Sequence, residues 1–274
     1  MSLAEAIVLG IVQGLTEFLP ISSSAHLRIV PAFAGWEDPG AAFTAVIQLG
    51  TMAAVLLYFR HDLVRIATAW IASLRDRGRR SELDARLGWY LILGTVPILI
   101  FGVAFKNQIE NGARDLYLIG TMLVVFGLVL LAAEARSRRN RDIATITRRD
   151  AVAIGFAQAL ALVPGVSRSG ATISAGLLLG FDRVAAARFS FLLSVPAVVL
   201  SGLYELKDVV NGTAEGAVGA GPTAVATVLA FVTGYASIAL LLRFLTTHTT
   251  GVFVGYRVVL GTVVLALAAT AVIA

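Results

Sequence analysis

Hydrophobic residues occur along this chain in long continuous runs rather than in short alternating patterns. A membrane-spanning helix needs about 20 mostly apolar residues. Six stretches meet that length: roughly 41–59, 87–105, 116–134, 185–204, 223–243 and 252–272. The runs are rich in leucine and alanine and lack a period of two, which disfavours transmembrane β-strands. The pattern predicts an all-α integral membrane protein with six transmembrane helices.

Two further apolar segments, about 3–34 and 151–180, are interrupted near their centres by proline, glycine and clustered serine. Proline ends a helix because it lacks the backbone N–H and clashes with the preceding turn. The residue before a proline is also driven toward an extended conformation. Each segment is therefore expected to be a helix–break–helix hairpin rather than a continuous span.

Composition supports a membrane environment. The chain is 58% hydrophobic and 14% charged, whereas soluble proteins carry about 25% charged residues. A soluble fold of this size cannot hide so much apolar surface, and the absence of cysteine excludes a secreted disulfide scaffold. The net charge of +5 could suggest nucleic acid binding. The positions of the basic residues along the chain decide whether that interpretation holds.

The basic residues instead indicate how the chain is oriented. With the six spans alternating, one side holds seventeen of them, in segments 60–86 and 134–150 and at Arg183, Arg188, Arg243 and Arg257. The other side holds four: Arg28, Lys106, Arg114 and Lys207. The positive-inside rule assigns the first side to the cytoplasm. We therefore expect the arginine runs to anchor the inner leaflet, with no nucleic acid partner, and both chain ends to lie outside the cytoplasm.

This orientation makes both interrupted segments re-entrant. The span beginning at 41 starts on the outer side, so segment 3–34 enters and leaves from outside, and segment 151–180 enters and leaves from the cytoplasm. Their tips then reach toward the middle of the membrane. Non-helical backbone is tolerated at that depth only when it is buried in protein or lines a wet cavity.

The two halves of the chain resemble each other at a period near 145 residues. Matches occur in order: Gly10 to Gln13 with Gly155 to Gln158, Leu19-Pro20 with Val163-Pro164, and Ser23 with Ser167 after a one-residue shift. Residues 1–137 and 138–274 each contain one hairpin and three spans. Because three is odd, the second half is inverted. The sequence thus predicts a single membrane domain, 1–274, built as an inverted-topology repeat with a site near the midplane.

The first break carries several groups capable of chemistry. Gln13 and Glu17 are four residues apart and share a helix face. Three serines, Ser22, Ser23 and Ser24, can cap the next half-helix, whose first turns hold His26. Ser23 and His26 are three apart, so we expect them to be neighbours on that helix. Ser23 is a candidate nucleophile and His26 a candidate acid or base.

The second break adds an arginine to the same kind of helix start. Pro164-Gly165 interrupts the helix, and Ser167, Arg168, Ser169 and Thr172 follow. Helix N-termini present free N–H groups and partial positive charge, and arginine matches phosphoryl oxygens. Two such termini and Arg168 describe a phosphate cradle. Glu17 beside an anion is then a metal ligand or a proton carrier.

Purely structural alternatives exist for these residues. Serine and proline in membrane helices often provide only kinks and interhelical hydrogen bonds. A Glu17–Arg168 ion pair that simply joins the two halves is the corresponding alternative for the charged residues. Gln13 either supports Glu17 through a hydrogen bond or contributes to a metal site. Ionisable residues inside a membrane are nevertheless functional by default.

The two tips, QGLTEFLPISSSAH and PGVSRSGAT, resemble the signature of the bacterial undecaprenyl-diphosphate phosphatases of the BacA type, and the resemblance covers essentially the whole chain. It implies removal of the terminal phosphate from undecaprenyl diphosphate, recycling of the lipid carrier for peptidoglycan synthesis, and bacitracin resistance. It also implies a divalent cation, Mg²⁺ or Ca²⁺, and an active site that opens to the extracytoplasmic side of the bacterial cytoplasmic membrane.

Carried over by motif position, the resemblance implies catalytic roles for Glu17, Ser23, His26 and Arg168. It implies supporting contacts with the substrate from Ser22, Ser24, Ser167, Ser169, Thr172 and Gly165, and metal binding by Glu17 and Gln13. Two departures are visible. Gln13 takes the amide rather than the acid option, which removes one possible metal-binding charge, and Ser24-Ala25 stands where Thr-Gly is expected.

We therefore predict a membrane hydrolase acting on a polyprenyl diphosphate. The rival hypothesis is a polyprenyl-phosphate flippase or another alternating-access transporter without hydrolysis, because inverted repeats with broken helices suit alternating access. The adjacent serine and histidine favour chemistry, since an anion carrier needs the arginine but not these groups. A homodimer is a further possibility, because Gly88, Gly94 and Gly102 would allow close helix contact.

Overall fold

The computed structural model describes residues 1–106, 108, 114–210 and 219–273. Its α-helices are α1 (Leu3–Phe18), α2 (Ser23–Ala34), α3 (Gly40–Tyr58), α4 (Arg60–Arg75), α5 (Leu83–Ala104), α7 (Leu116–Arg136), α8 (Arg148–Ala159), α9 (Arg168–Leu178), α10 (Arg183–Val210), α11 (Ala220–Leu245) and α12 (Gly251–Ala269). Short 3₁₀ turns are η1 (Arg77–Ser81), η2 (Ile143–Thr145) and η3 (Leu160–Leu162). Within the described ranges, β-pairing is limited to an isolated bridge between Arg141 and Phe181.

The predicted apolar stretches are all helical. Helices α5, α7, α11 and α12 and the Arg183–Leu200 part of α10 are long and apolar enough to cross a membrane. Helix α3 passes the same test only together with α4, from which it is bent by 74°. The protein is therefore an all-α, multi-pass membrane protein, as the hydrophobic pattern indicated.

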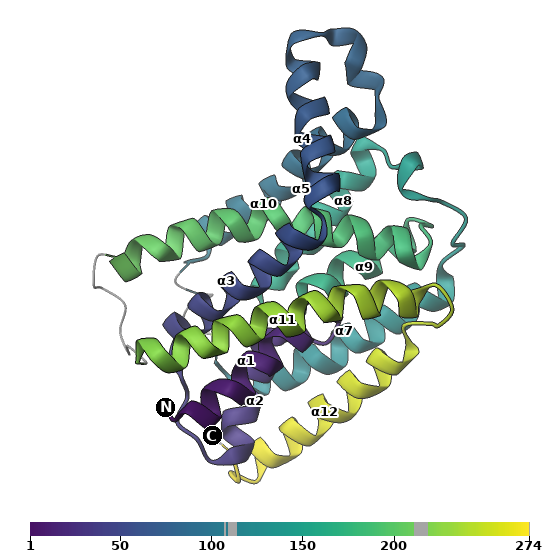
Figure 1. Ribbon diagram of the computed structural model, residues 1–274. Coiled ribbons are helices and arrows are strands. Elements are labelled where there is room, and N and C mark those ends of the chain that lie inside the picture. The colour runs from purple at the N-terminus through teal and green to yellow at the C-terminus, as the bar shows by residue number, and fades with distance from the viewer. Residues whose placement is uncertain (107, 109–113, 211–218, 274) are drawn as a thin grey trace.

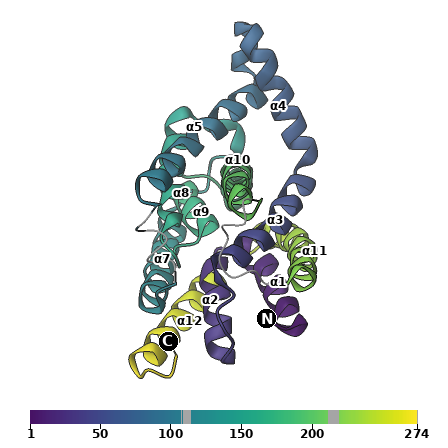
Figure 2. The same ribbon diagram turned by 90° about the vertical axis from the view of Figure 1, so that its left-hand side faces the viewer.

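Helix α4 was not expected, because its segment appeared to be a basic connection between spans. Helices α3, α7, α11 and α12 form a bundle, and α4 with the start of α5 projects from it as an arm (Figures 1 and 2). The arm is held by the Trp70 and Trp89 rings, whose centroids lie 5.7 Å apart. Its outer face exposes Val64, Ile71 and Leu74.

The first halves of the two interrupted segments pack in corresponding ways. Helix α1 lies along α11, and α8 lies along α5. A Cβ added to Gly10 would come within 2.4 Å of the Ala226 carbonyl oxygen, and one added to Gly155 within 2.4 Å of the Gly94 carbonyl oxygen. Only glycine permits this backbone approach. Helices α7 and α12 pack against each other behind these pairs.

Both predicted helix breaks are confirmed. Helix α1 ends at Phe18, and Leu19, which precedes Pro20, is extended at φ −67° and ψ 143°. Residues 19–22, here called the first tip, lead into α2. Residues 163–167, the second tip, lead into α9. Ser22 and Ser167 occupy the same place before their helices and both have positive φ, 74° and 72°.

Candidate active site

The carboxylate of Glu17 lies at the meeting point of the two tips. Its Oε1 accepts a hydrogen bond from Nη2 of Arg168 at 2.6 Å. Its Oε2 accepts one from Oγ of Ser23 at 2.5 Å and another from Nε2 of Gln13 at 3.1 Å. Glu17, Ser23 and Arg168 of the predicted catalytic group therefore lie together, and Gln13, the predicted partner of Glu17 in a metal site, joins them. The Glu17–Arg168 ion pair, foreseen as a structural alternative, is present as well.

Local chain geometry explains why Ser23 and Arg168 meet the same carboxylate. Each is the first residue of a half-helix, α2 or α9, directly after a serine with positive φ. The positive ends of both half-helices thus lie at Glu17. Ser167 Oγ caps α9 by accepting from Gly170 N at 3.1 Å. Ser22 forms no such side-chain cap on α2, which leaves first-turn N–H groups of α2 for a ligand.

The remaining serines and Thr172 have different surroundings. Ser22 and Ser24 are joined through their hydroxyls at 3.2 Å, as Ser167 and Ser169 are at 3.1 Å. Ser169 Oγ also donates to the Leu19 carbonyl at 2.9 Å, which ties the two tips together. Thr172 Oγ1 bonds Arg168 O within α9 and Ser190 of α10, at 2.7 and 2.6 Å. Its contacts are therefore those of a helix-packing residue.

His26 is fixed by partners that its spacing did not predict. Nδ1 lies 2.7 Å from the Ser22 carbonyl oxygen, and Nε2 lies 2.6 Å from the hydroxyl of Tyr256. A carbonyl only accepts, so Nδ1 carries the proton and Nε2 of the neutral ring accepts from Tyr256. The two rings are stacked, with centroids 5.5 Å apart. Ser23 and His26 lie three residues apart at the start of α2, as expected. Within the described ranges no hydrogen bond joins their side chains, because each is bonded to another partner.

Arg257 is a second residue of α12 that reaches the tips. Its side chain is fully buried. Nη1 donates to the carbonyl of Pro20 in the first tip at 3.0 Å, and Nη2 to those of Gly165 and Val166 in the second at 2.9 and 3.1 Å. Gly165 itself has φ +89° and packs against the Ile119 carbonyl. The assignment of Arg257 to the cytoplasmic surface is therefore wrong, because the guanidinium joins both tips inside the bundle.

The group around Glu17 has a limited capacity for metal. No cluster of three or more histidine, cysteine, aspartate or glutamate side chains occurs in the described part of the chain. Gln13 is 1% exposed, however, and its Oε1 has no hydrogen-bond partner among the described residues. An amide oxygen and a carboxylate are hard ligands, and Mg²⁺ commonly takes only one or two carboxylates together with substrate phosphates. The donor set therefore fits a cation that is shared with a diphosphate.

Fold and site together define a multi-pass membrane protein in which two broken helical hairpins place a carboxylate, a hydroxyl and a guanidinium at one point. A family model described as "Bacitracin resistance protein BacA" matches residues 6–263. The chain belongs to this family.

Several similar proteins match this chain over nearly their full length. The chain is 58% identical to an undecaprenyl-diphosphatase of Nocardioides sp. over 98% of both chains. It is 54% identical to an undecaprenyl-diphosphatase of Mycolicibacterium gilvum, over 100% of this chain and 99% of the relative. It is 51% identical to undecaprenyl-diphosphatase 2 of Streptomyces avermitilis, over 98% and 96%.

Proposed function

We propose that this protein hydrolyses undecaprenyl diphosphate to undecaprenyl phosphate and inorganic phosphate, which recycles the lipid carrier of peptidoglycan synthesis and confers resistance to bacitracin. The observation that carries the proposal is the Glu17 carboxylate, which holds the Ser23 hydroxyl at 2.5 Å and the Arg168 guanidinium at 2.6 Å. The names and full-length similarity of the relatives support the same activity.

The diphosphate binds where α2 and α9 begin. Backbone N–H groups at a helix N-terminus and an arginine fork both favour phosphoryl oxygens. When substrate enters, Arg168 transfers a hydrogen bond from Glu17 to a phosphate oxygen. The Glu17–Arg168 pair thus pre-orients the guanidinium and keeps its charge satisfied until the substrate arrives.

Ser23 is the nucleophile in this proposal. Glu17 accepts the Ser23 proton as Oγ bonds to the terminal phosphorus. The bond from that phosphorus to the bridging oxygen breaks, and undecaprenyl phosphate leaves with the electron pair. Arg168 and the helix N-termini stabilise charge on the transferred phosphoryl group. Water then attacks the phosphorus of the phosphoserine, and the bond from phosphorus to Ser23 Oγ breaks. Glu17 returns its proton to Oγ, and inorganic phosphate leaves.

His26 handles the second proton. Once Glu17 is protonated, the neutral His26 ring is the base that the tips still offer among the described residues. The hydrogen bond of Nδ1–H to the Ser22 carbonyl fixes the ring, and Tyr256 marks Nε2 as the basic nitrogen. In this proposal His26 takes a proton from the water that attacks the phosphoserine.

A divalent cation, Mg²⁺ or Ca²⁺, fits the same site. Glu17 and the unpartnered Oε1 of Gln13 would hold it. When bound, the cation would neutralise part of the negative charge of the diphosphate.

The architecture that we propose is an inverted-topology repeat with six transmembrane helices and two re-entrant hairpins, formed by residues 1–137 and 138–274. It is supported by the paired packing of α1 with α11 and α8 with α5, and by the matching Ser22 and Ser167 conformations. In this orientation the site opens to the extracytoplasmic side of the bacterial cytoplasmic membrane. The basic segments then lie in the cytoplasm.

A homodimer gains no support from the glycines that motivated it. A Cβ on Gly88 would meet the Trp70 side chain at 2.7 Å, and one on Gly94 the Ala151 carbonyl oxygen at 3.0 Å. Both glycines thus serve contacts within one chain. Dimer formation remains a prediction for mass measurement in detergent.

Phosphate release from undecaprenyl diphosphate by the purified protein with Mg²⁺ tests the proposal. We expect release by the wild type, and a loss of about 10²–10⁴-fold in the His26→Ala variant, the range typical of acid–base residues. The Ser23→Ala variant should lose activity at least as strongly. Wild-type release no higher than that of the His26→Ala control would favour the flippase or transporter, whereas near-normal release by the Ser23→Ala variant would show that water attacks directly.

A further inference from the structure

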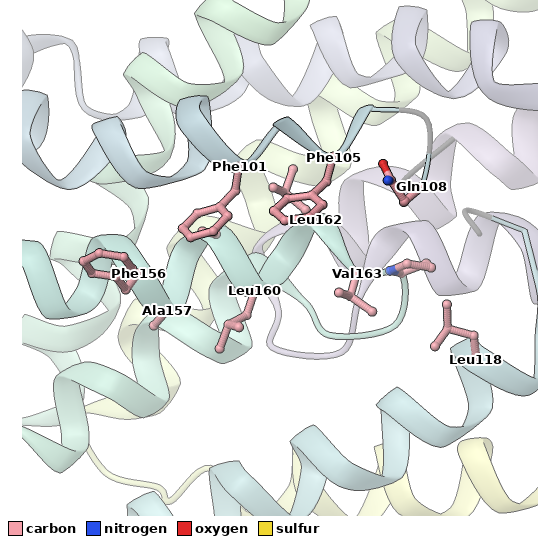
Figure 3. A pocket seen from close by; sticks show the side chains of 11 residues that line it. Phe101, Phe105, Gln108, Leu118, Phe156, Ala157, Leu160, Leu162 and Val163 are labelled. Atoms are coloured by element: carbon pink, nitrogen blue, oxygen red, sulfur yellow. The ribbon is translucent and has the colours of Figure 1, made fainter. Parts of the chain in front are cut away.

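An apolar groove of about 590 Å³ runs beside the second tip. Phe101 of α5 and Phe105, which directly follows α5, form one wall. Phe156 and Leu160 form another, and Leu118 of α7 closes one end (Figure 3). Among the described residues that line it, Gln108 has the one polar side chain. The catalytic proposal above uses no part of this groove.

The position of the groove connects it to the candidate phosphate site. Val163 and Pro164 line it, and the next residues, Gly165 and Val166, are those whose carbonyls Arg257 holds. The groove extends from there toward the ends of α5 and α7 that flank the connection between them. In the proposed orientation these are the outer ends, so the groove leads from the tip toward the outer leaflet.

The groove also opens to the surroundings of the protein. Phe105, Phe156 and Leu160 remain 47–53% exposed although they form its walls. In a membrane this surface faces lipid, so a chain can enter sideways without passing through water. An apolar cavity with so few polar partners does not hold ordered water well.

We propose that this groove binds the isoprenoid chain of the substrate, with the first unit at Val163 and Pro164 and the following units along Ala157 and Leu160. This inference rests on the function proposed above. A chain that leaves a diphosphate at the second tip meets Val163 and Pro164 first. Flat aromatic faces pack well against the planar, methyl-branched double bonds of an isoprenoid. A phospholipid chain would fill the same groove without being fixed at the tip.

A second groove is the alternative site for the isoprenoid chain, and its position makes it less suitable than the first. It is smaller, about 430 Å³, and touches the first tip at Leu19, between α11 and the start of α12. Arg243, Thr247 and His248 are among its lining residues. Its polar lining residues lie at the cytoplasmic end of α11 in the proposed orientation, opposite to the side toward which the site is proposed to open. It therefore offers a matched control within the same chain.

The test compares a long and a short substrate. An Ala157→Trp variant fills the first groove, and a Leu160→Trp variant narrows its wall. Leu240→Trp places the same bulk in the second groove. For each protein, kcat/KM is measured with C55 and with C5 isoprenoid diphosphates. We expect the two groove variants to lose about tenfold or more with C55, since tenfold corresponds to ~1.4 kcal/mol, or roughly two buried CH₂ groups. Their C5 activity should stay within about twofold of wild type, which also shows that they are folded.

The outcomes separate this inference from the proposed function. If wild type does not hydrolyse the C55 substrate, the function itself fails. If wild type hydrolyses it and the Ala157→Trp and Leu160→Trp variants keep the wild-type ratio of C55 to C5 activity, the groove holds no substrate chain and a bilayer lipid is its occupant. An equal loss in the Leu240→Trp control would overturn the assignment to the first groove.

Discussion

The hydroxyl of Tyr256 connects α12 to the imidazole of His26 at 2.6 Å, while the neighbouring Arg257 connects it to both tips. Two consecutive side chains thus reach the hairpins from a helix that is distant in sequence. Their contacts differ in kind. Tyr256 acts on the orientation of one ring, whereas Arg257 acts on backbone that carries several groups of the site.

Replacing Tyr256 by phenylalanine removes one hydrogen bond and keeps the stacked ring. We expect kcat for phosphate release to fall about fivefold with KM little changed, because a hydrogen bond of ~1 kcal/mol that orients a catalytic ring affects the chemical step. The measurement is steady-state phosphate release. Tyr235→Phe on α11 is the control and should behave as wild type. An unchanged kcat in the Tyr256→Phe variant would remove Tyr256 from the site.

Replacing Arg257 tests a positioning role. Arg257→Met leaves buried carbonyls of both tips without donors, at about 1–3 kcal/mol for each unsatisfied group. We expect a clearly lower melting temperature in detergent and no activity. Arg257→Lys keeps the charge but replaces the guanidinium fork by one ammonium, so it should fold better and still lose most of kcat.

The control for Arg257 is Arg75→Met, at an exposed arginine of α4. It should change neither the melting temperature nor activity. If Arg257→Met kept wild-type stability and activity, the tips would be held by other contacts, and the proposed positioning role would be wrong.

Sequence spacing could predict part of this site and not the rest. Glu17, Ser23 and Arg168 lie near proline breaks in apolar segments. Polar and ionisable residues are costly inside a membrane, so their presence there identifies them as candidates. Tyr256 and Arg257 lie in an uninterrupted apolar run without such a break. The count of basic residues on each side of the membrane also placed Arg257 in the cytoplasmic group. Only packing between helices reveals that its guanidinium meets five backbone carbonyls rather than water.

At the scale of elements, the sequence predicted the helices that are apolar along their whole length. It did not predict a helix that is apolar on one face only. Helices α5, α7, α11 and α12 follow from their apolar runs. Helix α4 has 16 residues and carries charged residues near both ends, so it is too short and too polar for a span of its own. The arginine count drew attention away from its apolar face. For the proposed repeat, the backbone conformations favour an alignment shifted by one residue at the tips. Ser22, not Ser23, shares the conformation of Ser167, so Ser23 takes the place of Arg168.

The start of α8 is stabilised by an ion pair that gives a prediction about acid stability. Arg141 donates to both carboxylate oxygens of Asp150, at 2.6 and 3.2 Å, and Thr147 completes a capping box. Burial raises the pKa of Asp150, but the hydrogen bonds from Arg141 and Thr147 outweigh it and hold the pKa below its ordinary value of 3.8. A lowered pKa in the folded protein means that ionised Asp150 favours folding.

This contribution is fully present above the ordinary pKa and is lost as the pH falls through the lower pKa of the folded protein. Asp150→Asn should therefore reduce stability by about 2 kcal/mol at pH 7, and the difference from wild type should shrink below pH 3.8. Thermal unfolding in detergent across this range is the measurement. Glu82→Gln, at a solvent-exposed pair with Arg79, is the control and should have little effect. A difference that stays constant down to low pH would contradict the assignment to Asp150.

At the scale of the whole molecule, the distribution of charge and the order of hairpins and spans together predict how the chain is oriented in the membrane. Helix α1 begins and α2 ends on the same side only if the first hairpin is re-entrant. Orientation then follows from the arginines, which remain strongly asymmetric after Arg257 is removed from the count. Neither statement depends on the catalytic residues, so both are testable in a catalytically inactive background.

The chain contains no cysteine, so a single introduced cysteine reports its own location. We expect a membrane-impermeant maleimide to label Leu3→Cys and Glu37→Cys variants in intact cells, because both positions are exposed and lie before and after the first hairpin. Thr247→Cys, in the exposed connection between α11 and α12, should react only after the membrane is permeabilised. Labelling of Leu3→Cys and Glu37→Cys from opposite sides would mean that the hairpin spans the membrane. A reversed pattern at all three positions would keep the hairpin re-entrant but turn the site toward the cytoplasm, which would contradict the proposed orientation.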